Sequence, residues 1–251
     1  MNYLKERDGD LFSNADLKRL IVPLLIEQLL AIAVGMADSI MVSSVGEAAV
    51  SSVSLIDTIF ILLINMFTAI ATGGAVVCGQ YIGKKRPHKA CEAADQLLLV
   101  TTALSVVIMA AVYLLKQFIL HVVFGNITAE VERNCNIYLM IVAASIPFLA
   151  VYNGCAAIFR AQGDSKTPMK ISIVMNLINI SGNALLVYAL KFGVDGVAIP
   201  TLLSRMYAAV AAFVLVHNKR YPVRCSYPVK LKPDFHMLKK ILGIGIPNGL
   251  E

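Results

Sequence analysis

Three acidic residues stand inside long apolar stretches of the sequence, where a charged side chain is seldom tolerated without a function. Glu27 and Asp38 lie in the first apolar stretch, and Asp57 lies in the second. A charge within a bilayer costs a few kcal/mol or more, so an intramembrane carboxylate is a candidate site for a proton or a cation. At a rise of about 1.5 Å per residue, Asp38 and Asp57 fall in the outer half of a membrane and Glu27 near its middle.

Each of these carboxylates also has a structural interpretation. Asp57 would be a hydrated residue at the membrane interface, and Asp38 would belong to a helix end near an external turn. Both interpretations stay open beside the functional ones. For Glu27 we favour a packing role, with hydrogen bonds to Gln28 and its neighbours, because Glu251 occupies the equivalent place in a repeated motif.

A second polar cluster lies in the fifth apolar stretch, which reads MNLINISGN. Asn176, Asn179 and Asn183 recur at spacings of three and four residues, so they share one face of a helix. Their amide oxygens can bind a cation, and their amide hydrogens can bind a carboxylate. From these residues alone, hydrogen bonding between helices and an ion or substrate site are equally good explanations.

Catalytic motifs do not accompany these residues. The sequence contains no GxSxG, HExxH or Walker pattern. The four histidines lie in loops or at helix ends without metal-ligand spacing, and the five cysteines include no CxxC pair. We therefore expect no enzyme and no cofactor other than a coupling ion.

Membrane-spanning helices must position these polar residues, because the composition excludes an ordinary soluble domain. The chain of 251 residues is 58% hydrophobic and 15% charged, with a mean hydropathy of +0.73, whereas soluble domains are about a quarter charged. Each apolar stretch is near the ~20 residues that a helix needs to cross a bilayer. We predict an all-α integral membrane bundle of six helices, at about 17–45, 50–82, 93–123, 131–159, 169–190 and 197–216.

The basic residues indicate how this bundle is oriented. Of the 22 Lys and Arg residues, 18 lie on the side that holds the N-terminus, so the positive-inside rule places that side in the cytoplasm. This distribution indicates a membrane topology rather than a surface that binds nucleic acid. We expect a cytoplasmic segment (1–16), a six-helix transmembrane lobe (17–218), a cytoplasmic connector (219–236) and the start of a seventh helix (237–251).

A weak internal repeat predicts a second lobe. The segments LKRLIVPLLIE and LKKILGIGIPNGLE both place Pro and Glu four residues apart behind basic residues, at Pro23 and Glu27 and at Pro247 and Glu251. We therefore expect a second six-helix unit to begin at the end of the chain. We expect the chain to be part of a protein about twice as long.

Several segments, taken in order, resemble the MATE (multidrug and toxin extrusion) family. They are PLLIEQLL, ADSIMVSSVGEAAVSSVSL, GQYIGKKRPHKA and, most specifically, IFRAQGDSKTPMKISIVMNLINISGN continuing into GVDGVAIPTLLSR. The resemblance covers essentially the whole chain. It implies the N-terminal lobe of a twelve-helix antiporter of the cell membrane, which exports amphipathic, often cationic drugs in exchange for H⁺ or Na⁺. Its expected partners are these drugs, membrane lipids and a C-terminal lobe.

The resemblance also implies a cation site in this lobe, for H⁺ or Na⁺. Its residues by motif position are Asp38, Asn179, Asn183 and Thr201, with Asn176 and Asp57 as further polar candidates. Pro23 matches a proline of the first helix that is linked to bending. The family often has Asp where Asn183 stands, so Asp38 is left as the main titratable group of the site.

Two alternatives accompany the antiporter hypothesis. The first is a flippase for lipid-linked oligosaccharides in the same superfamily, which would need several cationic side chains for a pyrophosphate. Arg205 is the sole basic residue well inside a predicted helix, which argues against this alternative. The second is a half-length subunit that pairs with a separate second lobe.

Overall fold

The computed structural model describes residues 14–125, 127–218, 221–225 and 233–250, and the regular structure in these ranges is helical. Most of the predicted N-terminal segment and much of the connector therefore lie outside the described residues. The helices are α1 (Asn14–Ser43), α2 (Glu47–Gly83), α3 (Pro87–Leu114), α4 (Lys116–Phe118), the π-helical turn η1 (Ile119–Val123), α5 (Ala129–Ala143), α6 (Ile146–Ala161), α7 (Lys166–Asn183), the π-helical turn η2 (Ala184–Ala189), α8 (Asp195–Val216) and α9 (Phe235–Leu250).

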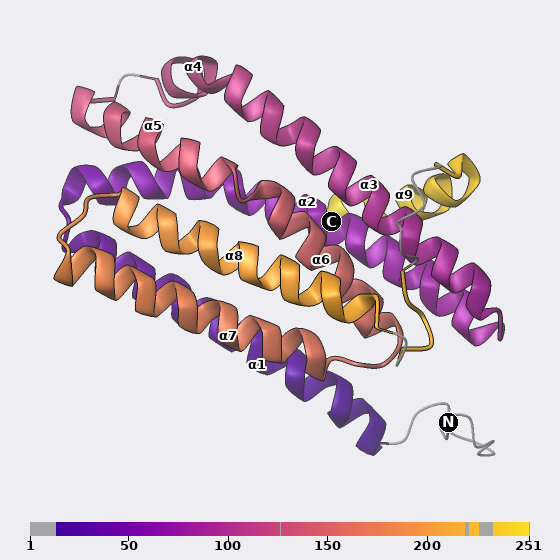
Figure 1. The fold of residues 1–251 in the computed structure, drawn as a ribbon. Helices are drawn as coiled ribbons and strands as arrows, with labels where there is room; N and C mark the ends of the chain where they lie inside the picture. The colour runs from indigo at the N-terminus through magenta and orange to yellow at the C-terminus, as the bar shows by residue number, and fades with distance from the viewer. Residues whose placement is uncertain (1–13, 126, 219–220, 226–232, 251) are drawn as a thin grey trace.

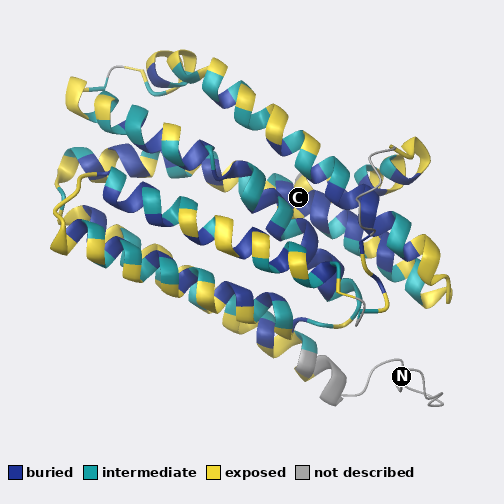
Figure 2. Ribbon diagram, in the orientation of Figure 1, coloured by how far each residue is buried: buried dark blue, intermediate teal, exposed yellow. Residues whose placement is uncertain are grey.

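The prediction of a six-helix membrane bundle is confirmed. Five helical segments are long and apolar enough to cross a membrane, and α5 with α6 makes a sixth span that is bent by 43°. In Figure 1, α1, α7 and α8 lie side by side, α5 and α6 lie along α8, and α2 and α3 complete the lobe. Buried residues gather between the helices, whereas much of α1 is exposed (Figure 2).

The fourth predicted helix is not continuous as expected over 131–159. The α-helix is interrupted at Ala144 and Ser145, immediately before α6, whose first turn contains Pro147. Proline in the first turn of a helix costs no hydrogen bond, whereas inside a continuous helix it removes one and crowds the preceding turn, so a helix break just before Pro147 is favourable. The buried hydroxyl of Ser145 donates to the carbonyl of Val142 over 2.6 Å, which satisfies part of the broken helix end.

Two other predicted helices end earlier as α-helices than the apolar pattern indicated. The third begins at Pro87 and ends at Leu114, rather than spanning 93–123, and its continuation contains the π-helical turn η1. The fifth changes from α to π geometry after Asn183. Such turns are frequent at functional sites, and η2 begins directly after the last of the three asparagines.

Helix α9, the predicted start of a seventh span, packs across α2 with close backbone contact. A Cβ atom on Gly73 would overlap the carbonyl oxygen of Ile241, and one on Gly245 would lie 3.0 Å from the carbonyl oxygen of Ala69. Small residues at such a crossing let two helices approach closely. Gly73 of ATGG and Gly245 of GIG therefore serve the packing of α2 against α9.

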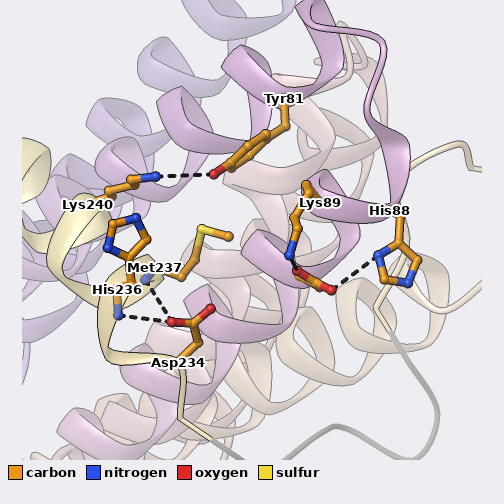
Figure 3. A network of polar contacts seen from close by, with 8 residues as sticks. Tyr81, His88, Lys89, Asp234, His236, Met237 and Lys240 are labelled. Carbon is orange, nitrogen blue, oxygen red and sulfur yellow. Dashed lines mark hydrogen bonds and ion pairs between the residues drawn. The ribbon is translucent and has the colours of Figure 1, made fainter.

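The N-terminus of α9 is held by a polar cluster beside α2 and α3 (Figure 3). Asp234 caps the helix, since its Oδ1 accepts hydrogen bonds from the backbone N–H groups of His236 and Met237. The backbone N–H of Asp234 in turn donates to Gln96 of α3 over 2.9 Å. Lys240 reaches the hydroxyl of Tyr81 on α2.

Candidate functional site

The carboxylate of Asp38 lies against α7, the helix that carries the asparagine stripe. Asn183 Nδ2 donates a hydrogen bond to Asp38 Oδ1 over 2.6 Å. When Asp38 is ionised, this short contact is a charge-assisted hydrogen bond, which is stronger than one between neutral groups. An acidic residue of the first span and an amide of the fifth are therefore joined although they are far apart in the sequence.

The network continues from Asn183 to a third helix. Asn183 Nδ2 lies 3.3 Å from Asn179 Oδ1, and Asn179 Nδ2 donates to the hydroxyl of Thr201 on α8 over 3.1 Å. Thr201 itself donates to the carbonyl of Val197 one turn earlier. Asp38, Asn183, Asn179 and Thr201 thus form one hydrogen-bonded cluster that links α1, α7 and α8.

Burial leaves two atoms of the asparagine stripe without partners. Asn183 is fully buried and Asn176 is 8% exposed, yet Asn183 Oδ1 and Asn176 Nδ2 make no hydrogen bond within the described structure. An unsatisfied buried polar atom costs about 1–3 kcal/mol, so a water or an ion is one partner that these two atoms could take. Asn176 shares the face of the cluster without joining its hydrogen bonds.

The cluster fits a small hard cation or a proton. Its possible ligands are all oxygens: the Asp38 carboxylate, the amide oxygens of Asn179 and Asn183, and the hydroxyl of Thr201. Oxygen donors suit hard cations, and the free lone pairs of Asn183 Oδ1 are available to one. Within the described part of the chain, no group of three or more His, Cys, Asp or Glu side chains could hold a metal ion.

Asp57 belongs to a neighbouring polar group rather than to this cluster. Its carboxylate accepts a hydrogen bond from the hydroxyl of Tyr138 on α5 over 3.2 Å. Arg205 on α8 interacts electrostatically with both Asp57 and Asp38. The guanidinium of Arg205 donates to Ser145 over 2.7 Å and lies 5.6 Å from the ring centroid of Phe60. The sequence marked Arg205 as unusual, but nothing in it identified Tyr138 or Ser145 as partners.

Glu27 has partners, but they are not its neighbours along the first helix. Its two carboxylate oxygens accept hydrogen bonds from Tyr152 over 3.1 Å and from Arg160 over 2.8 Å, both from α6. The expectation of bonds to Gln28 and nearby residues was therefore wrong. Sequence reasoning missed Arg160 because it stands beside a polar loop, although its place in IFRAQGD shows that it ends an apolar helix.

Pro23 is buried one turn before Glu27, and α1 continues through it. Proline removes the backbone hydrogen bond that would reach the preceding turn. The α1 backbone therefore lacks one hydrogen bond in the turn that ends at Pro23, about one turn before Glu27 and about four turns before Asp38.

The fold and the cluster define a polytopic membrane protein with a buried polar site between its helices. The MatE family model matches residues 23–185, and the chain belongs to this family of membrane transporters. Over 91% of its length it is 32% identical to the uncharacterized transporter YisQ of Bacillus subtilis, and over 92% it is 28% identical to the probable multidrug resistance protein YoeA of the same organism. These matches cover 50% and 51% of the two relatives, so the chain spans about half the length of its curated relatives and corresponds to the N-terminal lobe.

Solved structures share this architecture. A MATE transporter in complex with MaL6 superposes with a TM-score of 0.88, and an outward-facing MATE transporter of the MOP superfamily with 0.85. Both are 24% identical to the chain, and each alignment covers 94% of this chain and 52% of the other. At this identity the likeness establishes the fold, which is the N-terminal six-helix bundle of a MATE transporter.

Proposed function

We propose that the chain is the N-terminal lobe of a multidrug efflux antiporter, which exchanges amphipathic or cationic drugs for H⁺ or Na⁺. The observation that carries the proposal is the buried cluster of Asp38, Asn183, Asn179 and Thr201, which joins three helices around one carboxylate. The relatives that are named as probable multidrug resistance proteins support the choice of substrate class. The functional unit would contain a second lobe, as part of a longer chain or as a separate subunit.

In the proposed mechanism, the hydrogen bonds of the cluster change when Asp38 is neutralised. With Asp38 charged, Asn183 donates to it and leaves its own Oδ1 without a partner. A proton on Asp38 would turn the carboxyl into a donor, and rotation of the Asn183 amide would present Oδ1 to accept it. A bound Na⁺ would use the same oxygen, so either ion would reorganise the link between α1 and α7.

This reorganisation would be passed on through α1. Neutralising Asp38 lowers the penalty of burying it more deeply, and α1 would bend where Pro23 interrupts its hydrogen bonds. A structurally similar MATE transporter has been crystallised in bent and straight conformations. Bending would narrow the drug cavity, and the two lobes would then rock to the inward-open state.

The orientation and location are part of the proposal. The concentration of Lys and Arg on the side of the N-terminus supports a cytoplasmic N-terminus in the cell membrane. Arg205 and Arg160 are both engaged by protein partners, which weighs against the alternative of a flippase for lipid-linked oligosaccharides. Native mass spectrometry in detergent would separate a longer chain from a pair of half-length subunits.

Gradient-driven efflux tests the proposal. The functional protein, expressed from its natural reading frame, is reconstituted in liposomes loaded with ethidium, a monovalent cationic dye, and an inward H⁺ or Na⁺ gradient is imposed. We expect dye efflux from the wild type and from Glu130→Gln, which removes an exposed carboxylate at the start of α5, but not from Asp38→Asn. Undiminished efflux with Asp38→Asn would refute the proposed role of the cluster.

A further inference from the structure

Helices α1 and α7 carry polar residues in matching register. Glu27 lies eleven residues before Asp38, and Ser172 lies eleven residues before Asn183. Eleven residues make about three helical turns, or roughly 16 Å, and return to the same face. The two helices run side by side (Figure 1), so the contact of Asn183 with Asp38 places Ser172 at the level of Glu27.

We call the interface between α1 and α7 the α1–α7 seam. Contacts at the Glu27 end of this seam agree with the register of the two helices. The hydroxyl of Tyr152 on α6 lies 3.1 Å from Glu27 Oε1 and 3.4 Å from the carbonyl oxygen of Pro168, which stands about one turn before the buried Ser172 on α7. Arg160 Nη2 lies 2.8 Å from Glu27 Oε2, while the Nε of the same guanidinium is buried without a partner. Glu27 thus sits in a second polar cluster, whose only other charged member among these contacts is Arg160.

Asn176 lies between the two clusters on the same stripe of α7. It follows Ser172 by four residues and precedes Asn183 by seven. Its side chain is 8% exposed and its Nδ2 has no partner. The open Nδ2 of Asn176 can donate to a buried water, and the amide oxygen of the same side chain is the atom that can bind a passing cation.

We propose that Glu27 is a second, inner station for the coupling cation, reached from Asp38 along the α1–α7 seam by way of Asn176. Arg160 acts as the resident countercharge. The arriving cation takes its place on the Glu27 carboxylate, and when the guanidinium pairs with Glu27 again it displaces the cation toward the cytoplasmic side. This inference rests on the proposed antiport function. It assigns Glu27 a role beyond the packing role that its ion pair alone would support.

Three variants separate an inner station from a structural ion pair. Glu27→Gln removes the charge, and Asn176→Leu removes the amide at similar volume. The double variant Glu27→Gln/Arg160→Gln replaces the ion pair by a neutral hydrogen-bonded pair. If Glu27 only holds α1 to α6, the double variant regains activity. If Glu27 binds the cation, the double variant stays impaired, because it still lacks the carboxylate.

Coupled efflux and equilibrium dye binding are measured on the reconstituted functional protein, with H⁺ and Na⁺ gradients in separate arms. We expect Glu27→Gln, Asn176→Leu and the double variant to slow gradient-driven ethidium efflux at least about tenfold, the effect of losing one charged hydrogen bond in the rate-limiting step. Ethidium affinity at equilibrium should change less than about twofold, because the drug site is left intact. The unfolding temperature identifies any variant that has simply lost its fold, and Glu130→Gln is the control.

Each result has a separate meaning. Recovery of wild-type efflux in the double variant, or wild-type efflux in Glu27→Gln alone, overturns the inner station. If Asp38→Asn loses efflux in the same experiment, the proposed antiport function is retained and only the role of Glu27 is rejected. Absence of gradient-driven efflux in the wild type overturns both proposals.

Discussion

At the scale of single residues, one face of α7 carries three buried asparagines, Asn176, Asn179 and Asn183. Asn183 and Asn179 connect a single carboxylate, Asp38, to a hydroxyl on α8. One carboxylate surrounded by neutral oxygens can be neutralised by one proton or one monovalent cation. If the cluster is the proposed cation site, the residue at position 183 should therefore tune it toward one ion or the other.

Replacing Asn183 by Asp should strengthen Na⁺ binding by about tenfold or more. A second carboxylate beside Asp38 adds negative charge to an oxygen site, and a cation relieves the repulsion between the two. Radiolabelled Na⁺ binding to the purified functional protein measures this, with Asn183→Ala as a variant that should not gain affinity. Equal Na⁺ affinity in wild type and Asn183→Asp would show that position 183 does not face the ion.

At the scale of elements, α9 is held to the bundle by its crossing of α2, and the loop of connector residues 221–225 adds a second set of contacts with α6. In that loop, Val223 and Cys225 are almost fully buried. Gln162, which follows α6, donates to the carbonyl of Val223 over 2.8 Å and accepts from its N–H over 3.0 Å. One glutamine thus replaces the backbone pairing that a neighbouring strand would provide.

The crossing of α2 and α9 should not tolerate a side chain on Gly73. Gly73→Ala should destabilise the protein by about 1–3 kcal/mol, because its Cβ would overlap the backbone of α9. Gly79→Ala, at a position with open space on the same helix, should instead be neutral or stabilise by up to about 1 kcal/mol. Thermal unfolding in detergent compares the two variants. Equal melting temperatures would contradict the close contact between α2 and α9 at Gly73.

Loss of Gln162 should expose the loop thiol. Burial raises the pKa of the Cys225 thiol, so at neutral pH little reactive thiolate is present and maleimide labelling of the native protein should be slow. Gln162→Leu removes two hydrogen bonds worth about 0.5–1.5 kcal/mol each, which should speed labelling by about tenfold or more. Peptide mass spectrometry follows Cys225, and an unchanged labelling rate would mean that the loop is held by other contacts.

At the scale of the whole molecule, the sequence predicted the spans but not the contacts between them. Apolar length and loop charge are local properties, so six crossings could be predicted from them. The interruption at Ser145 and the π turn after Asn183 could not, because α, π and bent segments have the same apolar pattern. The residues of the Asp38 cluster were grouped by family resemblance, and the hydrogen bonds between them depend on how three helices pack. The ion pair of Glu27 with Arg160 depends on packing across 133 residues, which no local pattern reveals.

The central claim, that Asp38 couples cation entry to drug exit, is tested most directly by reversing the exchange. An ethidium gradient is imposed across liposomes that contain the functional protein, without any ion gradient, and the opposing movement of H⁺ or Na⁺ is recorded. We predict that the dye gradient drives one of these cations in the opposite direction in the wild type and neither cation in Asp38→Asn. Dye-driven cation movement that persists in Asp38→Asn would contradict the claim.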